Sequence, residues 1–163
     1  MAANKKPRKK YKPKGLIRDP ITYVVSGLQP LAKADQMRLG IINHGSMERL
    51  VTGKADRTDW QNICTLLNVC VVMAEQGIGE EFIPDIKNAM QAHATCGKRL
   101  VKHGKLGYTG EELRLVNTAL DIHDQQIGIS TVQQMELAHK EVYKRLLNKH
   151  IYVSVRDEIT AEA

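Results

Sequence analysis

The stretch TDWQNICTLLNVCVVMAEQG at positions 58–77 decides the fold class of this chain. Its apolar residues recur every three or four positions, a spacing that places them on one face of an α-helix. Thr58 and Gln61 form a capping-box pattern that predicts the start of the helix, and Gly77 predicts its end. We therefore expect a core helix here. Its core face consists of Trp60, Ile63, Leu66, Leu67, Cys70, Val71 and Ala74.

The next segment continues the helical spacing and predicts a second core helix over about 79–103. Pro84 is compatible with this helix because it lies in the first turns, where its missing N–H costs nothing. Gly104 and Gly107 predict the end of the helix. Its apolar positions are Phe82, Ile86, Ala89, Met90, His93 and Ala94.

The longest periodic segment of the chain runs over 109–148 and opens with a capping box formed by Thr109 and Glu112. It is compatible with a single helix of about forty residues or with two helices. Ser130 and Gln133 form a further capping-box pattern, which favours a kink or a restart midway.

On the N-terminal side, the segment 31–52 predicts helix interrupted at Gly40 and again near Gly45, with a short helix over 46–51. Asp19 and Pro20 form an N-cap and first-turn pair that would start an earlier helix. The run ITYVV after them is also typical of a strand, so the sequence leaves this element open.

These elements predict one all-α domain, a helical bundle of about five helices. Its spine is an antiparallel hairpin of the helix over 79–103 and the last long helix. A chain of 163 residues is the usual size of one such core. We expect the helical domain over 19–150, a disordered basic arm over 1–18 and a C-terminal tail over 151–163.

The arm holds eight of the twenty-four basic side chains of the chain and none of the eighteen acidic ones. Residues 19–163 therefore sum to −2, and the net charge of +6 comes from the arm. Such a segment favours polyanions, above all DNA or RNA, although a solubilising tail has the same composition. The candidate nucleic-acid-binding residues of the arm are Lys5, Lys6, Arg8, Lys9, Lys10, Tyr11, Lys12, Lys14 and Arg18.

Lys98, Arg99 and Lys102 form a second basic cluster, with His103 and Lys105, at the end of the helix over 79–103. We interpret it as a candidate second contact to nucleic acid. Cations at a helix C-terminus are also favoured by the helix dipole alone, as in the similar cluster near the end of the last helix. The members of that cluster are Lys140, Lys144, Arg145, Lys149 and His150.

Other function classes lack their signals in the sequence. No apolar run reaches the length of a membrane span, and the basic start does not continue as a signal peptide, so we expect a cytoplasmic protein. Three cysteines without paired spacing indicate free, buried thiols. No phosphate loop, dinucleotide turn or nucleophile elbow is present. We expect no enzymatic activity, no cofactor and no metal.

The sharpest enzymatic alternative rests on His93, the pair His123 and Asp124, and Asp157. This order resembles that of HD-type metal phosphohydrolases, which are all-helical. The resemblance implies a divalent metal that activates water. Adjacent residues on a helix point about 100° apart, and we interpret His123 and Asp124 as a surface pair instead.

The segments KKYKPKG (9–15), Asp19-Pro20 and GKA (53–55) before an amphipathic helix resemble small basic uncharacterised proteins of proteobacterial phages and mobile elements. The resemblance implies a bacterial cytoplasmic setting. We expect a nucleic-acid-associated accessory protein. The alternative is a protein-interaction module that inhibits a host system, such as an anti-defence protein acting on a host protein or ribonucleoprotein. The sequence leaves homo-oligomer formation open, because its apolar residues fit an oligomer face as well as a core.

Overall fold

The structure is a computed structural model that describes residues 25–148 of the chain. This part is an all-α helical bundle, as predicted, and contains no β-strand, only an isolated bridge between Pro30 and Thr131. None of its helices combines the length and the apolar content needed to cross a membrane. The elements in chain order are α2 (Lys33–Val51), α3 (Arg57–Glu75), the 3₁₀ turn η1 (Glu80–Phe82), α4 (Ile83–His103), α5 (Gly110–Ile129) and α6 (Val132–Leu147).

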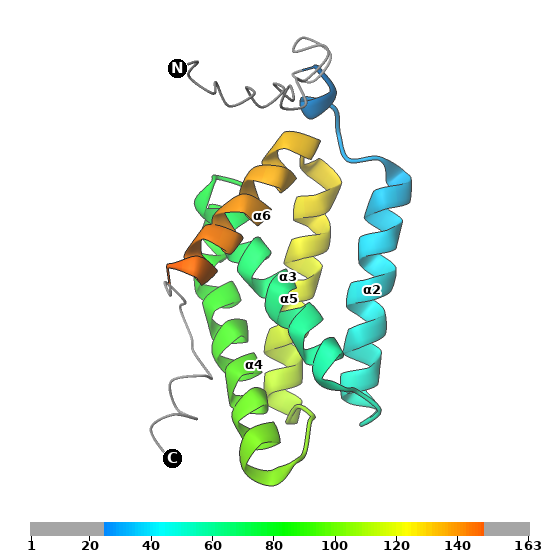
Figure 1. Ribbon diagram of the computed structural model, residues 1–163, viewed down its shortest axis with the longest axis vertical. Helices are drawn as coiled ribbons and strands as arrows, with labels where there is room; N and C mark the ends of the chain where they lie inside the picture. Colours follow the sequence, from blue (N-terminus) through cyan, green and yellow to red (C-terminus); the bar gives the residue numbers. More distant parts are fainter. Residues whose placement is uncertain (1–24, 149–163) are drawn as a thin grey trace, which may run out of the picture.

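Helix α3 crosses the middle of the bundle and packs against α2, α4, α5 and α6 (Figure 1). The core face predicted for this helix is confirmed except at Trp60, which is half-buried. Val69, Val72 and Met73 are also buried, because helices cover the second half of α3 on nearly all sides.

The start of α3 differs from the prediction. Asp56, not Thr58, is the N-cap, and its carboxylate accepts hydrogen bonds from the backbone N–H groups of Thr58 and Asp59 at 2.7 and 3.0 Å. The carboxylate of Asp59 in turn accepts a hydrogen bond from the backbone N–H of Asp56 at 3.1 Å. The pair Asp56 and Asp59 therefore forms the capping box, with aspartate in the place where the usual pattern has Glu or Gln.

The predicted interruptions at Gly40 and Gly45 are wrong, because α2 is continuous over 19 residues. A glycine inside a helix costs about 1 kcal/mol relative to alanine, which tertiary packing can offset. Here Met47 and Leu50 are buried against the bundle and hold the helix in place. The predicted end of the helix at residue 51 is confirmed, and Gly53, whose φ is 69°, follows it.

Helices α4 and α5 form the predicted hairpin, and α5 starts at the predicted Thr109 capping box. Of the two predictions for 109–148, the restart is confirmed. It begins at Thr131, whose capping box is with Gln134, and not at Ser130 with Gln133. The incoming chain at 29–31 pairs with the junction: Leu31 N–H donates to Ser130 O, and Val132 N–H donates to Gln29 O. These bonds satisfy backbone groups that the break leaves open.

Helices α3 and α4 approach each other closely at Gly97. A Cβ added to Gly97 would lie 2.8 Å from Cζ2 of Trp60, whereas a Cβ added to Gly40 in α2 would meet nothing within 4 Å. We expect Gly97→Ala to lower the free energy of unfolding by about 1–3 kcal/mol, since the indole must move. Gly40→Ala, the matched control, should raise it by up to about 1 kcal/mol. Urea unfolding of both variants tests this, and equal responses would contradict it.

Candidate polyanion-binding surface

The charge excess of the chain lies outside the described residues. Residues 25–148 carry fourteen basic and fourteen acidic side chains, so this part is neutral overall. All nine candidate residues of the arm, from Lys5 to Arg18, precede it and are outside the described residues. Whether the surface of the helical body can bind a polyanion therefore depends on which of its cations are paired with carboxylates and which are not.

Of the three predicted contacts on the body, Arg99 has a structural role. Its guanidinium donates to both carboxylate oxygens of Glu112, at 2.7 and 2.5 Å, and to the carbonyl oxygen of Gly107 at 2.7 Å. This hydrogen-bonded pair raises the pKa of Arg99 and lowers that of Glu112. Arg99 therefore fastens the α4–α5 connection. Lys98 is half-buried beside it, and Lys102 is exposed.

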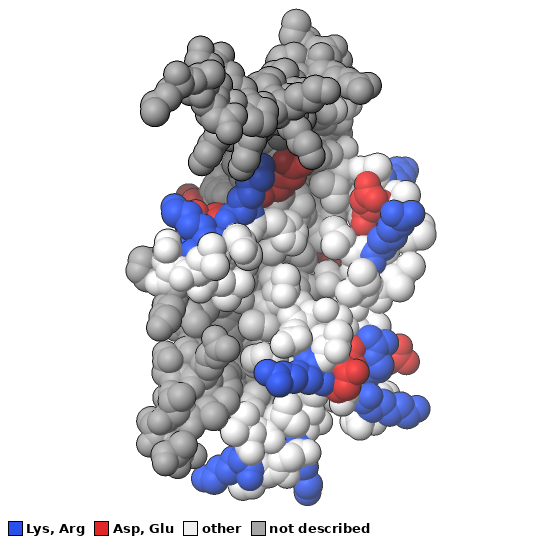
Figure 2. All heavy atoms as spheres, viewed as in Figure 1, with Lys and Arg blue, Asp and Glu red and all other residues white. Residues whose placement is uncertain are grey.

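The structure adds two cations that sequence reasoning missed. The last turn of α2 lies against the α4–α5 connection, because a Cβ on Gly107 would be 3.9 Å from the carbonyl oxygen of Leu50. Exposed cations lie in the α2–α3 and α4–α5 connections and in the helix ends beside them, and none of these cations forms an ion pair within residues 25–148. Figure 2 shows Lys and Arg side chains at this lower end of the molecule. We call this group the basic pole, and it consists of Lys54, Arg57, Lys102 and Lys105.

Three stacked or tilted rings, those of the buried His93 and the half-buried Trp60 and Tyr108, lie between α3, α4 and the α4–α5 connection. The imidazole of His93 stacks on the indole of Trp60, with ring centroids 4.8 Å apart. Its Nε2–H donates to the carbonyl oxygen of Trp60 at 3.0 Å, and the hydroxyl of Tyr108 donates to Nδ1 at 2.6 Å. Burial lowers the pKa of His93 to about 4. Both ring nitrogens are occupied, so this histidine joins α3, α4 and the α4–α5 connection as a neutral core residue.

The interpretation of His123 and Asp124 as a surface pair is wrong for His123, which is 3% exposed. The ring of His123 contacts the side-chain oxygen of Gln126 at 3.4 Å, and burial lowers its pKa to about 4. Asp124 points elsewhere and contacts Nε2 of His44 on α2 at 2.7 Å. That contact joins residues 80 positions apart, so the sequence carried no signal for it.

The residues of the enzymatic alternative do not form one site in the described structure. His93 and His123 are bonded to different partners, and Asp157 is outside the described residues. Within residues 25–148, no group of three or more His, Cys, Asp or Glu side chains is placed to hold a metal ion. The three cysteines are free thiols, and burial raises the pKa of each, that of Cys70 to about 12.

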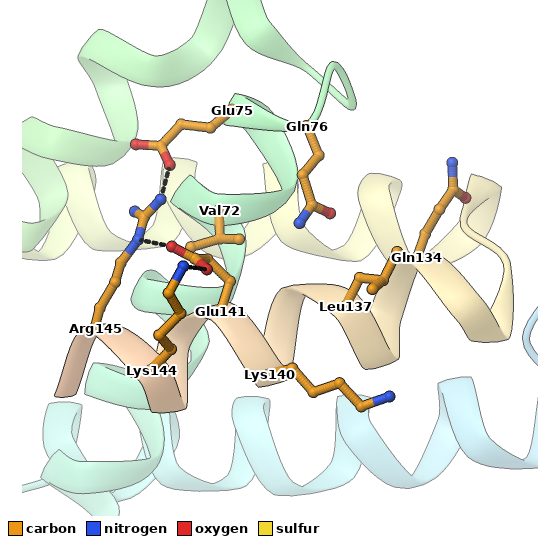
Figure 3. Close-up of a pocket in the computed structure, with 9 residues that line it drawn as sticks. All are labelled: Val72, Glu75, Gln76, Gln134, Leu137, Lys140, Glu141, Lys144 and Arg145. Atoms are coloured by element: carbon orange, nitrogen blue, oxygen red, sulfur yellow. Dashed lines mark hydrogen bonds and ion pairs between the residues drawn. The ribbon is translucent and has the colours of Figure 1, made fainter. Parts of the chain in front are cut away.

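The basic cluster on α6 is arranged differently from the basic pole. Its described members, Lys140, Lys144 and Arg145, line an open hollow of about 590 Å³ between α6 and the end of α3 (Figure 3), whereas Lys149 and His150 are outside the described residues. Arg145 bonds Glu75 at 2.6 Å and Glu141 at 3.0 Å, and Lys144 bonds Glu141 at 3.3 Å. Because these cations are paired with carboxylates, the hollow is close to neutral. Its apolar lining comes from Val72 and from Leu137, which is 48% exposed.

The basic pole and the start of the described chain lie at opposite ends of α2. The chain enters at 25–31 beside the α5–α6 junction, and the basic pole follows the other end of the helix. At 1.5 Å per residue, the 19 residues of α2 span about 28 Å.

Comparisons with protein-family models, with curated proteins and with solved structures give no match for this chain.

Proposed function

We propose that this chain is a non-enzymatic, nucleic-acid-associated accessory protein of a phage or mobile element, acting in the bacterial cytoplasm. The observation that carries the proposal is the separation of charge. Eight cations without an acidic residue precede a helical body whose described part has equal numbers of basic and acidic side chains. An arm of this kind binds the phosphate backbone of DNA or RNA through counterion release, largely without regard to sequence.

The basic pole provides a second contact in this proposal. Its four exposed cations form no ion pair with described residues, so they are available to phosphate groups, unlike the paired cations of α6. Contacts of this type position the nucleic acid and add affinity. In this proposal the arm attracts the nucleic acid, and the basic pole fixes its position on the helical body.

Removal of residues 1–18 is expected to weaken binding to DNA or RNA at least about a hundredfold at about 50 mM salt, because the counterion-release contribution is lost. Fluorescence anisotropy with labelled single- and double-stranded oligonucleotides measures this. The circular dichroism spectrum should stay helical in the shortened protein, which separates loss of binding from loss of fold. Equal affinity of the two proteins would overturn the proposal.

A second candidate function is a protein-interaction module that inhibits a host system, for instance in anti-defence. The hollow beside α6 favours it, because its apolar floor and neutral, hydrogen-bonding rim suit a polypeptide more than a phosphate backbone. Capture of host proteins from a lysate separates the two functions. A protein complex that survives nuclease treatment and is lost in Leu137→Asp supports this second function, whereas capture that depends on nucleic acid supports the first.

A further inference from the structure

Helix α2 lies at the edge of the bundle (Figure 1), and large apolar side chains on its outer side are exposed to solvent. Met37 and Ile41 are each 67% exposed, and they lie one helical turn apart. The opposite side of the helix, with Met47 and Leu50, is buried against the bundle. Along the exposed side the spacing is three or four residues throughout, so the side chains form one continuous face. We call it the α2 face, and it consists of Ala34, Met37, Ile41, Gly45 and Glu48.

We propose that the α2 face binds the same face of a second copy of this chain, with the two helices antiparallel and a two-fold axis passing beside Ile41. In that arrangement each residue before Ile41 lies opposite the residue the same number of positions after it in the second copy. The two Ile41 side chains then pack on each other.

Charge complementarity favours a second copy of this chain as the binding partner of the α2 face. Lys33 lies eight positions before Ile41 and Glu48 lies seven positions after it, so the two-fold axis brings them to nearly the same height. Successive residues are 100° apart around the helix, which places Lys33 about 80° and Glu48 about 20° to the same side of Ile41. Neither side chain forms an ion pair within residues 25–148. Each dimer therefore contains two new Lys33–Glu48 pairs.

The antiparallel pairing also brings together features that are far apart in one chain. The start of α2 in one copy lies beside the end of α2 in the other, next to Lys54 and Arg57 of the second copy. The arm of one chain and the basic pole of the second copy would then bind the same segment of nucleic acid. This consequence rests on the proposed function, whereas the pairing itself does not and is tested without nucleic acid.

Sedimentation equilibrium of the full chain, over about two decades of protein concentration, tests the pairing. We expect a reversible monomer–dimer equilibrium. Ile41→Glu should raise the dissociation constant by more than about tenfold, because it places two carboxylates against each other in the interface. Ile129→Glu is the matched control, since Ile129 is 75% exposed at the end of α5, and it should leave the constant unchanged.

Charge reversal tests the register. Lys33→Glu alone and Glu48→Lys alone should each weaken the dimer, and the double variant should restore it, because the exchanged charges attract again. Both changes complement the dipole of α2, so lost folding would not explain weaker association. A monomer at every concentration, a dimer indifferent to Ile41→Glu, or single variants that the double variant fails to rescue would each overturn the proposal.

Discussion

Acidification from pH 7 to pH 5 is expected to lower the free energy of unfolding by about 3 to 4 kcal/mol, through His93 and His123. Burial holds the pKa of each near 4 in the folded protein, against about 6.5 in the unfolded chain. Between these values the unfolded chain binds protons that the folded protein does not. The stability contributed by the neutral imidazoles is therefore complete above about pH 6.5 and is lost as the pH falls towards 4.

Urea unfolding followed at pH 7, 6 and 5 measures this loss. His93→Gln should remove about half of the pH dependence, since one of the two buried imidazoles is gone. His103→Gln, at an exposed position, should leave it unchanged. Stability that does not change between pH 7 and 5 would contradict the burial of these two rings.

The second large effect is expected at Asp59, whose side chain is 6% exposed and joins two helices. Its carboxylate accepts hydrogen bonds from Arg49 at 2.5 and 2.9 Å and from the hydroxyl of Ser46 at 3.0 Å. It also accepts the bond from the backbone N–H of Asp56 that completes the α3 capping box. Asp59→Ala should lower the free energy of unfolding by about 2–4 kcal/mol, because it opens the capping box and the buried network together.

Matched variants separate these contributions. Asp56→Ala removes only the N-cap and should cost about 1 kcal/mol, whereas Asp35→Ala at an exposed i,i+3 pair should cost less than about 0.5 kcal/mol. The Arg49 guanidinium holds the pKa of Asp59 at about 2, so its contribution is lost only as the pH falls below about 4. An Asp59→Ala protein as stable as Asp35→Ala would contradict the network.

Local patterns were sufficient to predict the helices whose signals lie within a few residues. The apolar spacing of 58–77 predicted α3, and Thr109 with Glu112 predicted the start of α5. The same reasoning missed Asp56 as an N-cap because the expected pattern ends in Glu or Gln. It overestimated the helix-breaking effect of Gly40 and Gly45, because the packing that holds α2 together comes from helices distant in the sequence.

The candidate site depends even more on contacts between residues that are distant in the sequence. Lys54 and Arg57 belong with Lys102 and Lys105 only because Leu50 and Gly107 meet in the folded protein. Arg99 resembled a free cation in the sequence, and its pairing with Glu112 across the connection gives it a structural role. The burial of His123 follows from the position of α5 in the bundle. The charge of the arm, which needs no fold, and the presence of cations at the end of the helix over 79–103 were evident from the sequence.

The salt dependence of nucleic-acid binding tests the central claim most directly. Two variants with equal loss of charge are compared with the unchanged chain: Lys9→Gln with Lys10→Gln in the arm, and Lys140→Gln with Lys144→Gln on α6. The slope of log affinity against log salt should become shallower by about 1.8 in the arm variant and stay the same in the α6 variant, because each phosphate contact on duplex DNA contributes about 0.9. Equal slopes for all three proteins, or an equal change in both variants, would contradict recruitment by the arm.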